Sequence, residues 1–149
     1  MIAWRTCKAR YHPYDGSGAA LQGGRWNSPG RSVIYAADSF AGSILEILAH
    51  SLRPRTLPGP HHAIRIVIPD ELVERLDPHR VPGWHLRDSA AARGFGDRWL
   101  AEVRTPALVV PALTSRPVGR IVVINPGHPD AGLLEREAPF EVPWDERLF

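Results

Sequence analysis

Three side chains in the first third of the chain could act together on a small anionic ligand. Arg25 follows two glycines in the stretch GGRWN, where backbone without Cβ atoms can approach a ligand closely. Its guanidinium is a planar, permanently charged fork that suits an anion. Tyr35 ends the apolar run SVIY, where its ring can stack on a flat group. Glu46 adds a carboxylate eleven residues further on.

The carboxylate lies in the clearest helical pattern of the sequence, residues 39–52. At about 100° per residue its apolar side chains fall on one broad side. The polar ones gather within roughly 80° on the other side. They are Ser39, Ser43, Glu46, His50 and Arg53. Asp38 or Ser39 can cap the first turn. This stripe is either a solvated face or one wall of a cleft shared with Arg25 and Tyr35.

Each residue of this set also has a purely structural explanation. A Gly-Gly pair is commonly a turn, and Arg25 on its own is an ordinary surface charge. Trp26 and Tyr35 on their own are ordinary core aromatics. The hypothesis of a site therefore depends on whether the loop, the strand and the helix converge on one cleft.

The elements that must position these residues are short. Apolar and β-branched runs bounded by Pro, Gly or polar residues predict strands over residues 2–5, 32–36, 63–68, 107–110 and 120–124. A second helix is predicted over residues 94–104, with turns at 69–76 and 131–136, and the alternating terminus FEVPWDERLF favours an edge strand. Strands and helices do not alternate regularly, which favours an α+β fold over a doubly wound sheet.

Composition sets the protein class. A chain of 149 residues with 44% hydrophobic residues predicts a single domain over residues 1–149. The first residues contain no apolar export signal, so we expect a cytoplasmic protein without membrane segments. The single cysteine, Cys7, fits a reducing compartment. Net charge is only +2 and no basic block occurs, so we expect no direct nucleic-acid binding.

Several common ligand signatures fail. GSGAAL begins like a dinucleotide fingerprint, but it follows YHPYD instead of a strand and has Leu21 at the third small position. There is no phosphate-binding loop of the Gly-Lys-Ser/Thr type. The seven histidines show no metal spacing, since His61 and His62 are adjacent. We therefore expect no metal.

The long segment GGRWNSPGRSVIYAADSFAGSILEILAH resembles the RES-domain toxins of bacterial type II toxin–antitoxin systems. The stretches VPGW, GDRWL, LVVPA, INPGHPD and DERLF follow the order of that family across nearly the whole chain. The resemblance implies an ADP-ribosyltransferase-like fold of mixed sheets with a few short helices. It also implies NAD as substrate and a helix-turn-helix antitoxin as partner.

The resemblance assigns residues to the site. It implies that Arg25, Tyr35 and Glu46 are catalytic. It implies that NAD is bound by the residues around them, namely Gly24, Arg25, Trp26, Asn27, Tyr35 and Ser39. The chain departs from the family at one position, because Ala112 follows Val110-Pro111 where the family has a serine. Thr114 or Ser115 is an alternative source of that hydroxyl, and so are Ser39 and Ser43 of the helix.

The reaction that the resemblance implies is cleavage of the nicotinamide–ribose bond of NAD, by hydrolysis or phosphorolysis, which would deplete cellular NAD. Two alternatives stay open. The first is transfer of ADP-ribose to a protein acceptor. The second is a catalytically impaired module that binds NAD, for which Ala112 would be the mark.

Overall fold

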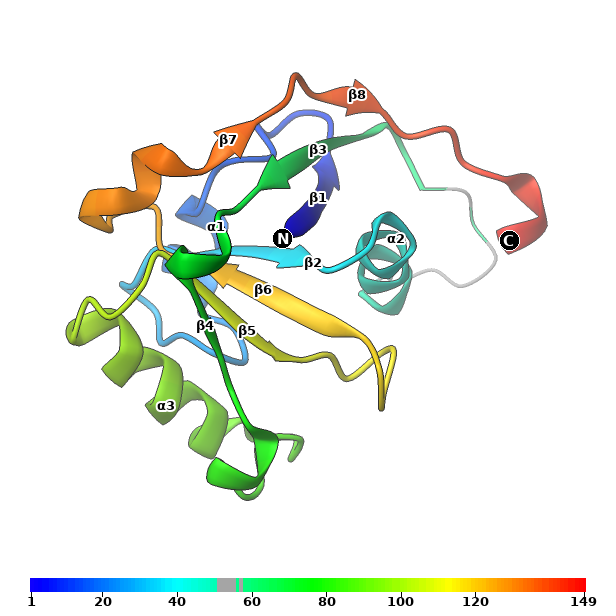
Figure 1. Ribbon diagram of the computed structural model, residues 1–149. Helices are drawn as coiled ribbons and strands as arrows, with labels where there is room; N and C mark the ends of the chain where they lie inside the picture. The colour runs from blue at the N-terminus through cyan, green and yellow to red at the C-terminus, as the bar shows by residue number, and fades with distance from the viewer. Residues whose placement is uncertain (51–55, 57) are drawn as a thin grey trace.

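The computed structural model describes residues 1–50, 56 and 58–149, and within them the chain is built on one mixed sheet (Figure 1). The strands are β1 Ile2–Lys8, β2 Ile34–Ala37, β3 His61–Val67, β4 Val73–Arg75, β5 Ala107–Pro111, β6 Arg120–Ile124, β7 Glu135–Arg136 and β8 Phe140–Glu141. Their order is β4-β5-β6-β2-β1-β3-β7, and β8 also pairs with β3. The pair β4–β5 is parallel and the other pairs are antiparallel. The predicted α+β fold is confirmed.

Three α-helices accompany the sheet in the described part of the chain: α1 Ser17–Gln22, α2 Phe40–Ala49 and α3 Ala90–Ala101. The shorter 3-10 helices span Asp70–Leu72, Pro78–Arg80, Pro129–Leu133 and Glu146–Leu148. Figure 1 shows α2 and α3 at different ends of the molecule. Helix α2 packs against β1 and β2, whereas α3 covers β5 and β6.

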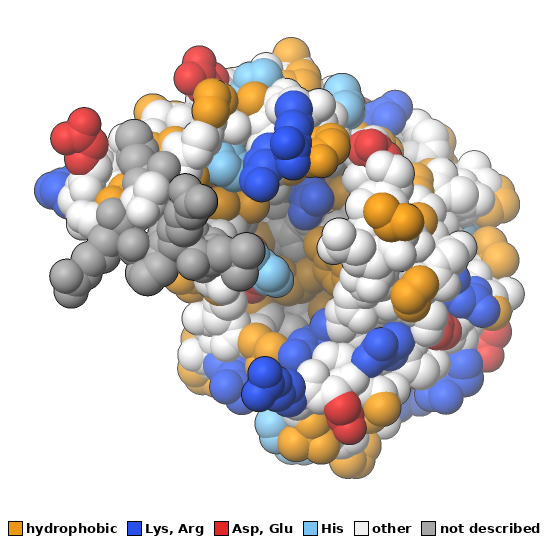
Figure 2. Space-filling view, turned by 180° about the vertical axis from the view of Figure 1, so that it is seen from behind, with side chains coloured by type: hydrophobic (Ala, Val, Ile, Leu, Met, Phe, Trp, Pro, Cys, Tyr) orange, Lys and Arg blue, Asp and Glu red, His pale blue; other side chains and the backbone are white. Residues whose placement is uncertain are grey.

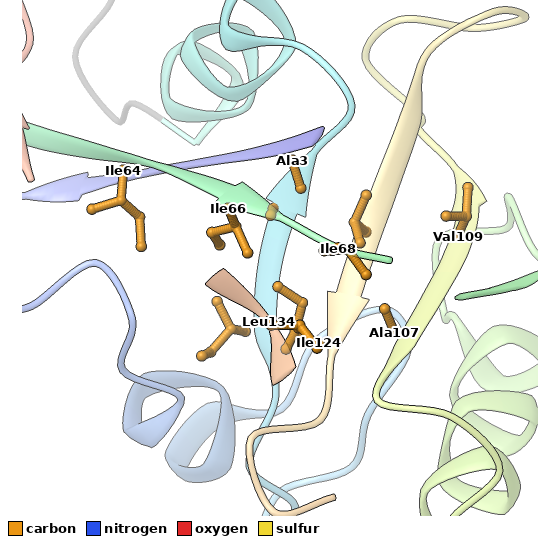
Figure 3. Close-up of a cluster of buried hydrophobic side chains, with 11 residues drawn as sticks. Ala3, Ile64, Ile66, Ile68, Ala107, Val109, Ile124 and Leu134 are labelled. Atoms are coloured by element: carbon orange, nitrogen blue, oxygen red, sulfur yellow. The ribbon is translucent and has the colours of Figure 1, made fainter. Parts of the chain in front are cut away.

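Both faces of the central strands are buried. Val109 and Ile124 point into the cluster drawn in Figure 3, together with Ile64 and Ile66 of β3. Leu108 and Val123 point to the opposite face, where they pack with Trp99 of α3. This arrangement explains why the strand sequences ALVVP and RIVVI are continuous apolar runs without alternation.

The predicted strands all form, with ends shifted by a few residues. The largest extension is at β1, which continues to Lys8 along its full antiparallel register with β3. The short strand β8 pairs with the outer side of β3, so the terminal edge-strand prediction is confirmed for Phe140–Glu141. No helix within the described ranges is long and apolar enough to span a membrane.

Other boundaries differ from the sequence prediction. Helix α3 begins at Ala90, four residues before the predicted start, because three alanines form its first turn. It ends before Val103, whose φ of 49° is left-handed. The segment predicted as a turn at 69–76 contains β4. Helix α1 was not predicted, because its short length and its glycine give no apolar period.

Candidate active site

One cavity of about 1110 Å³ collects the three residues with which the sequence analysis began. Arg25 reaches it from the loop after α1, Tyr35 from β2 and Glu46 from α2. Figure 2 shows a deep hollow on one face of the molecule, with lysine and arginine side chains around its mouth. The loop, strand and helix therefore converge on a common space.

Helix α2 turns part of its polar stripe toward the protein. Ser39 caps the helix by accepting a hydrogen bond from the backbone N–H of Gly42 at 3.0 Å, as predicted. Ser43 is 5% exposed and is the buried residue of α2, and its hydroxyl lies 2.8 Å from that of Thr6 on β1. This contact fixes the rotation of the helix, so Glu46, one turn further on, lines the cavity.

The stripe thus combines the two alternatives that the sequence left open. Ser43, Glu46 and the exposed His50 line the cavity, whereas Ser39 is exposed and does not line it. The imidazole of His50 is 80% exposed and lies 4.0 Å from Glu46 Oε2, while its Nδ1 is 2.7 Å from the backbone carbonyl of Glu46. Arg53 lies outside the described residues.

The carboxylate of Glu46 is held from across the cavity. The hydroxyl of Thr114, in the loop between β5 and β6, donates to Glu46 Oε1 at 2.5 Å. Thr114 also lines the cavity. The other oxygen, Oε2, has no hydrogen bond to the described residues and lies 4.0 Å from Nδ1 of His50.

Tyr35 offers its ring to the cavity while its hydroxyl is engaged behind it. The hydroxyl accepts from the backbone N–H of Trp26 at 2.9 Å and donates to Asn27 Oδ1 at 2.7 Å. Burial raises the pKa of Tyr35 to about 12, and the Trp26 N–H opposes this shift by stabilising the phenolate. The phenol therefore stays neutral at physiological pH, and its chemistry toward a ligand is that of an aromatic face.

The glycine before Arg25 is required by this arrangement. A Cβ atom on Gly24 would lie 2.5 Å from the hydroxyl oxygen of Tyr35, so only glycine lets the loop pass over the ring. Arg25 then projects into the cavity, anchored by Nη1, which donates to the backbone carbonyls of Trp84 and Leu86 at 2.8 Å each. Burial lowers the pKa of Arg25, yet a guanidinium remains charged at neutral pH.

Asn27 and Trp26 support the loop from below. Asn27 is fully buried, and its Nδ2 donates to the carbonyls of Ala19 and Arg31 at 2.9 and 2.8 Å. The indole of Trp26 is 2% exposed and stacks on Trp84 at a centroid distance of 6.4 Å. Trp26 lines the cavity, but neither Asn27 nor Ser39 is among the lining residues.

Helix α3 closes the underside of the same loop. Asp97 accepts hydrogen bonds from the backbone N–H and the hydroxyl of Ser28. Gly96 lies so close to the loop that a Cβ atom there would be 1.8 Å from the carbonyl oxygen of Trp26. The GDRWL stretch therefore holds the GGRWN loop in place. The sequence did not predict this contact, because the two stretches are far apart along the chain.

The structure adds lining residues that sequence reasoning missed. Arg5 of β1 lines the cavity and donates from Nη1 to the carbonyl of Tyr35 at 2.9 Å. Its Nε is buried and has no hydrogen-bond partner among the described residues. Burial lowers the pKa of Arg5. The sequence did not mark Arg5 as a site residue, since one arginine in a predicted strand carries no periodic signal.

Ser89 is a second unexpected lining residue. It is 8% exposed, immediately precedes α3 and has a φ of 58°, which is uncommon for a residue with a side chain. Backbone strain of this kind concentrates at functional sites. Its hydroxyl makes no capping hydrogen bond to α3.

The arrangement can bind a ligand that carries both signs of charge. Arg5, Lys8 and Arg25 line the cavity as cations, and Glu46 and Asp15 line it as carboxylates. No cluster of three or more His, Cys, Asp or Glu side chains suited to a metal occurs within residues 1–50, 56 and 58–149. The chemistry available is thus anion binding by guanidinium groups beside a carboxylate that can stabilise a developing cation.

Comparison with known proteins identifies the family of the chain. The model of the RES domain family matches residues 2–145. Over the full length of both chains, the sequence is 33% identical to a protein named Toxin Res from Pseudomonas putida. It is 37% identical over 86% of this chain and 84% of the other to the Prs ADP-ribosylating toxin of a Sphingobium strain.

A solved structure shares the fold. The Mycobacterium tuberculosis MbcT–MbcA toxin–antitoxin complex contains a chain that superimposes with a TM-score of 0.72 at 22% identity. The match covers 95% of the present chain and 83% of the other.

Proposed function

Because the chain belongs to the RES domain family, we propose that it is the toxin of a toxin–antitoxin pair and that it cleaves the nicotinamide–ribose bond of NAD. The relatives named Toxin Res support the first part. The observation that carries the second part is the shared cavity, in which guanidinium groups and the carboxylate of Glu46 face the same space.

Glu46 acts on the sugar. When the carbon–nitrogen bond breaks, its electron pair leaves with nicotinamide, and positive charge develops on the ribose ring. Glu46 Oε2 accepts a hydrogen bond from a ribose hydroxyl and stabilises that charge. A hydrogen bond to a charged group is worth about 1.5–3 kcal/mol.

Arg5 and Arg25 bind the diphosphate. Arg25 is anchored by one nitrogen, which leaves Nε and Nη2 free of hydrogen bonds to the described residues. Arg5 also lines the cavity, and its Nη1 is held by the carbonyl of Tyr35. Each guanidinium is anchored through Nη1 to backbone carbonyls, so a phosphate that enters the cavity can accept charge-assisted hydrogen bonds from the remaining nitrogens of the two side chains.

Tyr35 positions the leaving group. Its hydroxyl is held by Trp26 and Asn27, so the ring has one orientation and presents its face to the cavity. A neutral aromatic face stacks on the flat nicotinamide ring. Gly24 and Trp26 contribute backbone around this pocket, whereas Asn27 and Ser39 act through the loop and the helix cap.

The acceptor of ADP-ribose is water or phosphate. In hydrolysis a water oxygen forms the new bond to the ribose carbon and its proton is released to solvent, and in phosphorolysis a phosphate oxygen forms that bond. A second candidate is transfer to a protein side chain, which the name of the Sphingobium relative favours. A non-catalytic NAD-binding module is disfavoured, because Glu46 keeps a hydroxyl partner despite Ala112.

One experiment separates these functions. Antitoxin-free protein from cell-free synthesis is incubated with NAD labelled in the adenine ring, with and without phosphate and with a bacterial lysate. Free ADP-ribose indicates hydrolysis, a phosphorylated ADP-ribose indicates phosphorolysis, and a labelled protein band indicates transfer. NAD that remains intact in every reaction would refute an NAD-consuming enzyme.

The partner is an antitoxin, of the helix-turn-helix type that the family resemblance implies. Induced expression of the chain alone should stop growth and collapse the NAD pool. Co-expression of the protein encoded beside it should restore both. Growth arrest with a normal NAD pool would leave a toxin but exclude this reaction.

A further inference from the structure

We propose that Thr114 is a positioning residue for Glu46. The inference rests on the proposed function and adds to it a residue that acts through the catalytic carboxylate. It is carried by one contact across the cavity, from the Thr114 hydroxyl to Glu46 Oε1 at 2.5 Å.

The loop between β5 and β6 holds Thr114 in place. It is closed at its base by the Ala112 N–H, which donates to the carbonyl of Gly119 at 3.1 Å. The Gly119 N–H donates back to the carbonyl of Ser115 at 2.9 Å. These bonds make the loop compact and direct Thr114 into the cavity, whose lining also includes Pro111 and Leu113.

The other hydroxyls considered from the sequence are not available to Glu46. Ser39 accepts from Gly42 as the helix cap. Ser43 donates to the carbonyl of Phe40 at 2.8 Å and contacts Thr6. Ser115 and Ala112 are not among the residues that line the cavity, and Ala112 is 2% exposed.

The contact has a direct consequence for the reaction. By donating to Oε1, Thr114 fixes the rotation of the carboxylate and leaves Oε2 toward the ligand. A carboxylate that rotates freely would spend part of its time with neither oxygen directed at the ribose. Because this alignment matters for the developing charge, its loss should lower kcat more than it raises KM.

Kinetics of three variants test this role. Thr114→Val keeps the side-chain shape and removes the hydroxyl, Thr114→Ser restores it, and Ser115→Ala removes the neighbouring hydroxyl of the same loop. Nicotinamide release should fall at least about tenfold in kcat for Thr114→Val, with KM within about twofold. The kcat of Thr114→Ser should stay within about threefold of the wild-type value. The kcat of Ser115→Ala should equal the wild-type value.

A thermal-stability cycle tests the contact without any need for activity. Thr114→Val should lower the Tm by about 3 °C, and in a Glu46→Ala background it should cause no further loss. Additive Tm shifts would refute the contact itself. A wild-type kcat in Thr114→Val, or equal losses in Thr114→Val and Thr114→Ser, would refute the positioning role. Wild-type protein that releases no nicotinamide would refute the proposed function and the positioning role together, while the Tm cycle would still decide the contact.

Discussion

The hydroxyl of Tyr35 donates to the side-chain oxygen of Asn27 at 2.7 Å, and this bond joins β2 to the loop that carries Arg25. Asn27 also links this loop to α1 and to the segment before β2, since its Nδ2 donates to the carbonyls of Ala19 and Arg31. The aromatic face and the guanidinium of the site are therefore placed by one buried network. Such a network stabilises the fold when every polar group in it has a partner, and the removal of one member lowers the stability because it leaves polar groups without partners.

Replacement of Asn27 should disrupt this network. Asn27→Ala leaves the Tyr35 hydroxyl without its acceptor and removes the donor to the partly buried carbonyls of Ala19 and Arg31. We expect the free energy of unfolding to fall by about 1–3 kcal/mol, measured by urea denaturation. Asn27→Asp can still accept from Tyr35 but cannot donate to the carbonyls, so it should be no more stable than Asn27→Ala. Wild-type stability in either variant would refute the network.

The titration of Tyr35 gives a pH test. Because burial raises its pKa to about 12, the folded state holds the phenol proton between about pH 10 and 12 while the unfolded state releases it. Its contribution to stability is thus fully present below about pH 10 and is lost as the pH rises through 12. The difference in phenolate absorbance between wild type and Tyr35→Phe should show a midpoint near 12, and a midpoint near 10 would contradict the buried hydroxyl.

Helix α3 provides a matched pair of glycines. In Gly96→Ala the new Cβ would lie 1.8 Å from the carbonyl of Trp26, so the helix or the loop must shift. We expect a loss of about 1–3 kcal/mol and a lower rate of NAD cleavage. A Cβ atom added to Gly94 would meet no atom within 4 Å, so Gly94→Ala should instead raise the free energy of unfolding by about 0.5–1 kcal/mol. Equal effects at both positions would refute the docking of α3 on the loop.

Arg25 can be tested through substrate binding. Lysine lacks the planar fork, and it cannot reproduce the two carbonyl contacts together with a phosphate contact. Arg25→Lys should therefore weaken NAD binding by about tenfold, measured by calorimetry on a Glu46→Gln background, in which we expect consumption of the ligand to be more than about tenfold slower. The exposed Arg87→Lys serves as control. Unchanged affinity in Arg25→Lys would remove this residue from the site.

Much of this fold was readable from local sequence. The apolar runs of β5 and β6 and the capped helix after Ser39 have short-range signals, and their positions were predicted within a few residues. The start of α3 and the strand β4 were not. Their formation depends on packing against distant elements, such as the pairing of β4 with β5.

The site divides in the same way. Gly24, Arg25, Tyr35 and Glu46 fall within one continuous stretch, where residue types and helical spacing indicate their chemistry. Arg5 and Thr114 line the cavity from β1 and from the loop between β5 and β6, and the order of the strands in the sheet brings these distant segments to one cavity. Asn27 was expected to bind NAD, but in the structure its side chain bonds to Tyr35 and to the backbone and does not line the cavity. Sequence alone does not tell whether an amide faces a ligand or the backbone.

Glu46→Gln is the most direct test of the central claim, that the carboxylate of α2 stabilises positive charge on the ribose of NAD. Glutamine keeps the size of the side chain and an oxygen that can accept from Thr114, and it removes the charge. The measurement is the initial rate of nicotinamide release by folded wild-type and variant protein at equal concentration. We predict a rate below one tenth of wild type, a loss of more than about 1.4 kcal/mol in transition-state stabilisation. A variant that keeps more than that tenth, with an unchanged Tm, would contradict the account.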